Sequence, residues 1–215
     1  MNARLLDSIE LGVGTWQWGD RSTWGFGRDY TDHDVHAAFR ASLQAGLSFF
    51  DTAEVYGLGR SERLLGRFLK DAGTPALVAT KFLPLFFRLR RASLLRALRA
   101  SLRRLGLTQV ALYQIHFPFP PVSIESWMAA LAEAVQEGLT ASVGVSNYDL
   151  AQTRRAVAAL GRQGVPLAAN QVHYSLLHRQ VEDTGLLSFC REHGVRLIAS
   201  SPLEKGILSG KYSPT

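Results

Sequence analysis

Residues 47–70 read LSFFDTAEVYGLGRSERLLGRFLK, which is one strand-to-helix unit. The short apolar run at 47–51 is typical of a buried strand, and apolar residues recur at helical spacing over 60–70. A short segment with two glycines separates the two patterns. Because a strand followed closely by an amphipathic helix is the building unit of parallel sheets, this stretch favours an α/β fold.

The same alternation continues on both sides of this stretch. The expected strands are 9–14, 47–51, 76–80, 110–115, 140–145, 167–172 and 195–200. The expected helices lie near 32–45, 60–70, 91–104, 123–137, 148–160 and 180–193. Glycine follows four of these helices, at 46, 106, 138 and 194, where a residue that tolerates left-handed backbone ends a helix well. The pattern predicts a parallel sheet with helices outside it.

Two architectures fit this alternation, an open doubly wound sheet and a (β/α)8 barrel. An open dinucleotide-binding sheet usually carries G-x-G-x-x-G after its first strand. Here the first strand runs into GVGTWQWG (12–19), which lacks that spacing. The reactive polar residues instead follow several different strands, as they do at the C-terminal face of a barrel. The sequence therefore favours the barrel.

The strand count falls one short of that barrel. Seven strands are found, whereas the barrel has eight and typically needs about 250 residues. We therefore expect residues 1–215 to form a single domain, a (β/α)8 TIM barrel lacking its eighth strand and C-terminal helices. We interpret the chain as a truncated sequence rather than half of a split protein. Its first and seventh strands would keep unpaired edges, which make oligomerisation possible.

The composition is that of an ordinary globular protein, with 47% hydrophobic and 20% charged residues. Cys190 is the only cysteine, so no internal disulfide can form, and a reducing, cytoplasmic location is expected. The N-terminus, MNARLLDSIEL, lacks the apolar segment of a secretory signal. No apolar run approaches the roughly 18 residues of a membrane span. We expect no membrane association.

The formal net charge is +6, and much of it comes from arginines in RLRRASLLRALRASLRRLG (88–106). Leucines recur there at helical spacing, while the arginines form a separate stripe. This pattern predicts an outer helix with a solvated basic face. The segment has no interleaved aromatic residues and no recognised nucleic-acid motif, so we expect no nucleic-acid partner.

Four polar residues lie at or just beyond the ends of expected strands, namely Asp51, Tyr56, Lys81 and His116. In a barrel their side chains would converge on one rim. A nearby ammonium favours the phenolate, so we expect Lys81 to lower the pKa of Tyr56 from about 10 and make it a usable general acid. Asp51 can hold Lys81 by a charge-assisted hydrogen bond. His116 can orient a substrate oxygen.

Six segments together resemble the aldo-keto reductase family: FDTAEVYGLGRSERLLGRFL, LVATKF, LYQIH, GVSNYDL, NQVHYSLLHR and SPLEKGILSGKY. They occur in order through nearly the whole chain. The resemblance implies a (β/α)8 barrel that binds NADP(H) and transfers a hydride between nicotinamide and an aldehyde or ketone carbon. It implies that Tyr56 is the proton donor and that Lys81 tunes it. It also implies that Asp51 supports Lys81 and that His116 binds the carbonyl oxygen.

The resemblance further implies a set of cofactor contacts. Ser146, Asn147 and Gln171 would hold the nicotinamide carboxamide, which amides suit because they both donate and accept hydrogen bonds. The other implied contacts are Thr15, Trp16, Asp51, Ser200, Ser201, Pro202, Leu203 and Lys211. The family often places an aromatic residue against the nicotinamide where this chain has serine at 200. The family's adenosine 2′-phosphate site has no counterpart in these motifs, so NADP versus NAD preference is not encoded here.

Aromatic residues gather around the expected rim. Trp18, Trp24 and Phe26 follow the first strand. Five phenylalanines follow the third and fourth strands, namely Phe82, Phe86, Phe87, Phe117 and Phe119. The phenylalanines would either line an apolar pocket or shield the rim, and the sequence leaves both interpretations open. The tryptophan loop would add to the same wall.

Three other functions would use these residues differently. A non-catalytic relative, such as a channel-associated subunit, would bind cofactor without turnover. A glycosidase would need Asp51 and Glu54 to flank a sugar bond, although they lie three residues apart on one loop. A metal hydrolase would need a third ligand beside His33 and His36. We favour a carbonyl reductase acting on a small-molecule substrate, with no metal.

Overall fold

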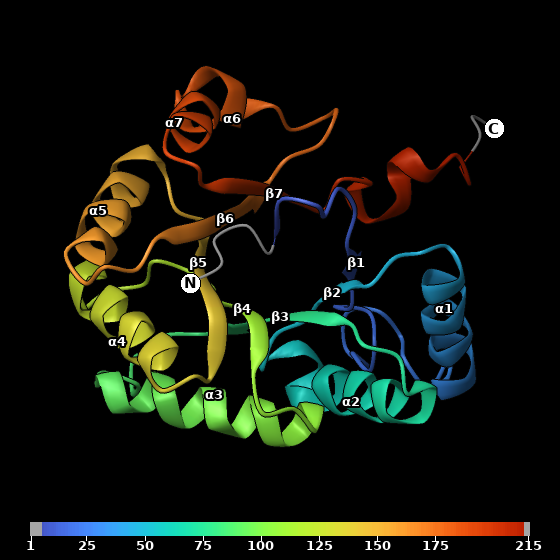
Figure 1. Ribbon diagram of the computed structural model, residues 1–215. Coiled ribbons are helices and arrows are strands. Elements are labelled where there is room, and N and C mark those ends of the chain that lie inside the picture. The colour runs from blue at the N-terminus through green and yellow to red at the C-terminus, as the bar shows by residue number, and fades with distance from the viewer. Residues whose placement is uncertain (1–5, 213–215) are drawn as a thin grey trace.

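The computed structural model describes residues 6–212, which form one curled parallel sheet wrapped by helices (Figure 1). The strands are β1 (Val13–Gly14), β2 (Phe49–Asp51), β3 (Leu77–Phe82), β4 (Val110–Ile115), β5 (Thr140–Ser146), β6 (Leu167–His173) and β7 (Arg196–Ser200). Each strand pairs in parallel with the next along the chain. This is the arrangement of a (β/α)8 barrel lacking its last strand, as the sequence predicted.

The helices lie on the outer face of the curled sheet (Figure 1). They are α1 (Asp32–Gln44), α2 (Arg60–Ala72), α3 (Arg91–Leu105), α4 (Ile124–Gln136), α5 (Leu150–Gly161), α6 (Gln180–Asp183) and α7 (Leu186–Glu192). Two 3-10 segments, η2 (Tyr56–Gly59) and η3 (Glu204–Ser209), follow β2 and β7. Within residues 6–212, no helix combines the length and the apolar character needed to cross a membrane.

Neighbouring residues of β2 show how the strands divide the core. Phe50 is fully buried on the helix side, where its ring packs 5.2 Å from that of Phe39. Phe49 belongs instead to a second buried cluster, with Leu112 and Ala169. Because successive side chains of a strand point to opposite faces, the sheet has an outer core against the helices and an inner core within the barrel.

Local capping explains where the helices begin and end. At the start of α5, Asp149 Oδ1 accepts a hydrogen bond from the Gln152 amide at 2.8 Å, and Gln152 Oε1 accepts one from the Asp149 amide at 3.0 Å. This capping box satisfies backbone donors that the first turn leaves free. At the end of α3, Gly106 takes a left-handed φ of 69°, as expected for a helix-ending glycine.

Two expected elements differ from the structure. The first strand was expected over 9–14 but covers only Val13–Gly14, because it pairs with β2 alone among the described residues. The helix expected over 180–193 is divided into α6 and α7 by Gly185, whose φ is 76°. Apart from shifts of one to two residues at their ends, the remaining strands and helices lie where their sequence patterns predicted.

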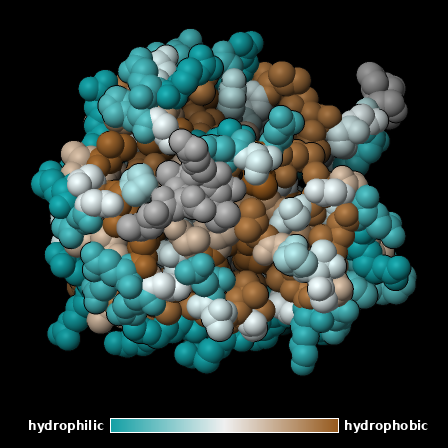
Figure 2. Space-filling model, in the orientation of Figure 1, coloured by the Kyte–Doolittle hydropathy of each residue, from teal (hydrophilic) through white to brown (hydrophobic). Residues whose placement is uncertain are grey.

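An open groove separates β1 from β7, which do not pair with each other. It has a volume of about 1350 Å³ and is lined by both strands, by the N-terminal segment and by the residues after β7. The residues of β7 are largely half-buried, whereas those of β4 are all buried. In the view of Figure 2, which has the orientation of Figure 1, hydrophobic residues reach the surface near the centre of the molecule. The expected unpaired edges are therefore present within residues 6–212.

Candidate active site

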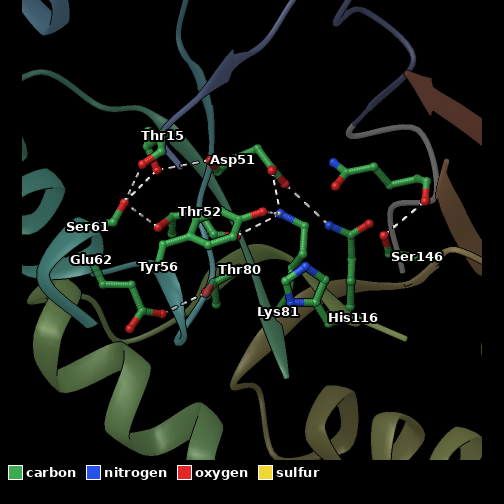
Figure 3. A network of polar contacts seen from close by, with 12 residues as sticks. Thr15, Asp51, Thr52, Tyr56, Ser61, Glu62, Thr80, Lys81, His116 and Ser146 are labelled. Carbon is green, nitrogen blue, oxygen red and sulfur yellow. Dashed lines mark hydrogen bonds and ion pairs between the residues drawn. The ribbon is translucent and has the colours of Figure 1, made fainter. Parts of the chain in front are cut away.

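The expected site residues gather where the parallel strands end (Figure 3). Asp51 is the last residue of β2, Lys81 lies near the end of β3, and His116 directly follows β4. Tyr56 begins η2, in the segment that leaves β2. Because all strands run in the same direction, their carboxyl ends meet on one rim, and the structure brings these four side chains together there.

Lys81 is the centre of this cluster and is fully buried. Its ammonium forms an ion pair with Asp51, donates to the Thr52 carbonyl at 2.9 Å and lies 3.4 Å from the Tyr56 hydroxyl. Burial acts to lower the pKa of Lys81, but the charge of Asp51 and the contact with Tyr56 raise it more. The net pKa is above the ordinary value, so Lys81 stays charged at neutral pH.

Tyr56 is held by aromatic neighbours on two sides. Its ring stacks on Trp16 with centroids 6.1 Å apart and meets His116 edge-on at 5.8 Å. The expected lowering of its pKa is wrong for this structure. Burial raises the pKa of the Tyr56 phenol, and this effect outweighs the lowering by Lys81, with Asp51 adding to the rise. The phenol therefore holds its proton at neutral pH.

His116 is a neutral imidazole in this environment. Burial, with a smaller contribution from the charge of Lys81, lowers its pKa from 6.5 to about 3. Its Nδ1 atom is buried and has no hydrogen-bond partner among residues 6–212. The backbone carbonyl of His116 accepts a hydrogen bond from Asn147 Nδ2 at 3.0 Å, which ties the end of β4 to that of β5.

A layer of hydroxyl groups supports the rim from below. Ser61 Oγ lies 2.7 Å from Thr15 Oγ1 and 2.9 Å from Thr52 Oγ1. Thr15 Oγ1 also donates to the Asp51 carbonyl at 3.1 Å. Thr15, which was expected beside a cofactor, lines the groove between β1 and β7, and its fully buried side chain is bound to these groups. It joins the first loop to β2 and to the start of α2.

Gln114 belongs to the same cluster, although the sequence did not single it out. It is fully buried, its Nε2 atom lies 3.4 Å from Asp51 Oδ1, and its Oε1 atom has no partner among the described residues. Gln114 pairs in register with Lys81 of β3. Its position two residues before His116 could have revealed it, because residues two apart on a strand share a face.

The residues expected to hold a carboxamide lie across the rim, at the ends of β5 and β6. Ser146 Oγ donates to the Gln171 backbone carbonyl at 2.9 Å, and the Asn147 backbone N–H donates to the same oxygen at 2.8 Å. Asn147 has a φ of 61°, a left-handed conformation that asparagine tolerates better than most residues. The backbone therefore fixes these three residues as one unit.

The remaining expected contacts line the groove between β1 and β7. These are Trp16, Gln171, Ser200, Ser201, Pro202, Leu203 and Lys211, and Asp51 and Tyr56 face the same groove. Lys205 also lines it and was missed in the sequence. Its Nζ atom lies 5.9 Å from the centroid of the Trp16 ring. The groove thus joins the Tyr56 side of the rim to two lysines on the segment after β7.

The expected aromatic wall is only partly present. Trp18 and Phe26 are buried in the outer core, where Trp18 packs against Phe39, Phe50 and Phe68. Assigning them to the wall was therefore wrong, and of these three aromatic residues only Trp24 lines the groove. Phe82 is also in the core, while Phe86, Phe87 and Phe119 are exposed. Phe117 stacks on His116 with centroids 4.9 Å apart.

The groups considered for glycosidase and metal chemistry have other surroundings. Glu54 Oε1 accepts from the Leu83 amide at 2.8 Å and pairs with Arg88, so it holds the loop after β3. Asp51 pairs with Lys81. His36 stacks on Phe68 at 4.7 Å. No group of three metal-ligand side chains occurs in residues 6–212.

Comparison with known proteins gives one consistent result. The family model described as the Aldo/keto reductase family matches residues 10–215. An uncharacterized oxidoreductase of Mycobacterium tuberculosis is 43% identical over 204 residues, covering 94% of this chain and 60% of that protein. The chloroplastic pyridoxal reductase of Arabidopsis thaliana is 39% identical over 216 residues, covering 94% and 59%.

A solved structure shows the same fold. The aldo/keto reductase from Klebsiella pneumoniae, in complex with NADP and acetate, is 30% identical with a TM-score of 0.77. The match covers 93% of this chain and 66% of that one. The chain spans about 60% of the length of the curated relatives it matches.

Proposed function

Because the chain belongs to the aldo/keto reductase family, we propose that it is part of an NADP(H)-dependent oxidoreductase that interconverts an aldehyde or ketone and the corresponding alcohol. The observation that carries the proposal is the buried Lys81 ammonium, which contacts both the Asp51 carboxylate and the Tyr56 hydroxyl on the rim of the groove. A buried charge pair next to a phenol is an arrangement suited to proton transfer.

In this proposal Tyr56 gives its proton to the carbonyl oxygen of the substrate. Its raised pKa keeps the phenol protonated at neutral pH, as a donor must be. The phenolate left after transfer would lie 3.4 Å from the Lys81 ammonium, which stabilises the negative charge. Asp51 holds that ammonium in place and keeps it charged. The three roles of Asp51, Tyr56 and Lys81 are thus complementary.

His116 is proposed to orient the substrate carbonyl. With a pKa of about 3 it is neutral near pH 7, so it acts as a hydrogen-bonding group and not as a proton source. Its ring meets Tyr56 edge-on at 5.8 Å, which puts a second polar group beside the phenol. Two donors converging on one oxygen stabilise the charge that develops there during reduction.

The groove suits an extended dinucleotide with amide and phosphate groups. When bound, NADPH supplies the hydride. Gln171 lines the groove and is bound to Ser146 and Asn147, and together they form a fixed polar unit able to hold a carboxamide. Lys205 and Lys211 offer positive charge to phosphates. Trp16 offers a flat aromatic surface in the groove. Ser200 also lines the groove but has no ring that could stack on nicotinamide.

We also propose that residues 1–215 act as one domain in the cytoplasm. The single cysteine, Cys190, is buried and free, and burial raises its pKa to about 11, so it is protonated at neutral pH.

The exposed edges of β1 and β7 are the surfaces where we expect association with another β/α unit or another copy of the chain. Sedimentation analysis over a range of concentrations tests self-association.

A direct experiment tests the proposed function. The purified 215-residue chain is titrated with NADPH while the cofactor fluorescence is recorded, and turnover is measured with a generic aldehyde and with pyridoxal. We expect NADPH to bind and at least one aldehyde to be reduced. Binding without turnover of any carbonyl would favour the non-catalytic alternative. No NADPH binding at all would refute the assignment for this chain.

A further inference from the structure

Residues 201–211, the strap, follow β7 and contain η3. No residue of η3 is buried. Three residues of the strap that are not glycine have left-handed backbone: Ser201, Glu204 and Lys205, with φ of 54°, 46° and 54°. Residues with side chains seldom adopt this conformation. An exposed segment with such a backbone keeps one conformation only where side-chain contacts hold it.

Glu204 supplies such a contact on one side of the groove. Its Oε1 atom lies 2.7 Å from His173 Nε2 and accepts a hydrogen bond from Ser175 Oγ. Ser175 Oγ also accepts from the amides of Leu177 at 3.1 Å and His178 at 3.0 Å. The rings of His173 and His178 stack with centroids 4.0 Å apart. Glu204 is therefore bound to a well-connected turn after β6.

The charge of Glu204 is part of this contact. The hydrogen bond from Ser175 lowers the pKa of Glu204 below its ordinary value of 4.5, against the opposing effect of burial, and His173 adds to the lowering. Glu204 is thus ionised at neutral pH. Ser175 donates to the carboxylate and not to the imidazole, so the cluster is an anchored carboxylate and not a histidine-activated nucleophile.

Lys205, the next residue, contacts the opposite side of the groove. Its Nζ atom lies 5.9 Å from the ring centroid of Trp16, and Trp16 stacks on Tyr56 at 6.1 Å. In Figure 1 the red strap runs from β7 toward the side of β1. The strap therefore connects the turn after β6 with the first loop, across the gap between β7 and β1.

We propose that Glu204 is a positioning residue. By binding His173 and Ser175 it fixes the strap so that Lys205 stays over Trp16, the ring that supports Tyr56. The consequence for catalysis rests on the proposed function, because the strap faces the proposed cofactor groove. The anchoring is a property of the chain alone and can be measured without cofactor.

Limited trypsin digestion of the full 215-residue chain measures the anchoring. Trypsin cleaves after lysine, and Lys205 and Lys211 lie in the strap. In Glu204→Ala the rate of cleavage after Lys205, followed by mass spectrometry, should rise roughly tenfold, the order expected for losing charge-assisted hydrogen bonds. Glu204→Gln should give a smaller rise, since its amide oxygen still accepts from Ser175. His173→Ala, which removes the other partner of Glu204, should also raise the rate of cleavage after Lys205.

Glu182→Ala is the matched control. Glu182 is also a carboxylate with two donors, Tyr174 at 2.7 Å and Arg179, and it holds the turn after β6 to α6 without contacting the strap. Its removal should leave cleavage after Lys205 unchanged. The proposal is overturned if Glu204→Ala is cleaved at the wild-type rate. It is also overturned if Glu182→Ala matches Glu204→Ala, because that result would mean general loosening. Circular dichroism checks that each variant is folded.

A second readout connects the strap to the cofactor. Glu204→Ala should weaken NADPH binding and raise KM for NADPH more than it lowers kcat, because the strap holds cofactor and does not transfer protons. Failure of the wild-type chain to bind NADPH would count against the proposed function alone. Unchanged cleavage after Lys205, with normal NADPH binding by the wild type, would count against the anchoring alone.

Discussion

The Nζ atom of Lys81 lies 3.4 Å from the hydroxyl oxygen of Tyr56. These two residues come from different strand units, 25 positions apart, and Lys81 reaches the phenol from a fully buried position. Burial acts to lower the pKa of Lys81, against the charge of Asp51, and to raise the pKa of Tyr56, against the charge of Lys81. Asp51 keeps the lysine charged, while burial keeps the tyrosine protonated. The pair therefore has a proton donor and the positive charge that stabilises its conjugate base.

Tyr56→Phe removes the proposed donor and keeps the ring that stacks on Trp16. We expect turnover of an aldehyde to fall by roughly 10²- to 10⁴-fold, the usual contribution of general acid catalysis. NADPH binding should stay close to that of the wild type, because the phenolic hydroxyl is not proposed to hold the cofactor. Steady-state kinetics and fluorescence titration measure the two effects. Undiminished turnover in this variant would exclude Tyr56 as the donor.

Lys81→Met should destabilise the fold as well as abolish turnover. It leaves the Asp51 carboxylate, which is only 14% exposed, without its cation. Removing one member of such a pair costs about 3 kcal/mol of the free energy of unfolding. The double variant Asp51→Asn with Lys81→Met should recover part of that loss, because no unpaired charge remains. Urea denaturation of the three proteins checks this, and a double variant no more stable than Lys81→Met would contradict it.

The low pKa of His116 predicts a pH dependence of stability. Above pH 6.5 the imidazole is neutral in both the folded and the unfolded chain, so it has no effect. Between 6.5 and about 3 the unfolded chain binds a proton that the folded chain does not. The free energy of unfolding should therefore fall as the pH falls through this range, by up to about 1.4 kcal/mol per pH unit.

His116→Gln should remove this contribution. The difference in stability between the variant and the wild type should change with pH below 6.5 and be constant above it. His33→Gln is the control, because the His33 side chain is 92% exposed. Denaturation curves across the pH range measure both. A constant difference for His116→Gln over the whole range would show that the imidazole is protonated in the folded chain as easily as in the unfolded one.

Two helical glycines should respond to alanine in opposite ways. A Cβ added at Gly66 of α2 would lie 2.5 Å from the Leu105 carbonyl of α3, so Gly66→Ala must push the helices apart. We expect a loss of about 1–3 kcal/mol of stability. At Gly161 of α5 no atom beyond the neighbouring residues and the helix's own backbone lies within 4 Å of such a Cβ. Gly161→Ala should stabilise by up to about 1 kcal/mol. Thermal unfolding compares them, and equal effects would contradict the predicted close approach.

Much of the fold could be predicted because its elements are set by local patterns. The apolar runs of β2 to β7 and the amphipathic helices between them are visible in the sequence. The order of these elements favours a parallel barrel, and a parallel barrel brings the strand ends to one rim. For this reason Asp51, Lys81 and His116 could be expected to meet before any distance was known.

Other features depend on contacts that no local pattern records. Trp18 and Phe26 were expected at the rim but lie in the outer core, because the first loop folds back against α1 and α2. The contact between Glu204 and His173 joins residues 31 positions apart. The contact between Gln114 and Asp51 likewise joins residues 63 positions apart.

The Lys81–Tyr56 pair depends both on what the sequence determines and on what only the tertiary structure decides. The sequence by itself determined that a lysine ends one strand and that a tyrosine follows another, and it therefore determined that the two would meet. Only the tertiary structure decided the state of the phenol. The pKa of Tyr56 depends on how much burial opposes the charge of Lys81, and burial is set by residues from the whole fold. In this chain burial outweighs the charge, so the pKa rises where the sequence alone predicted a fall.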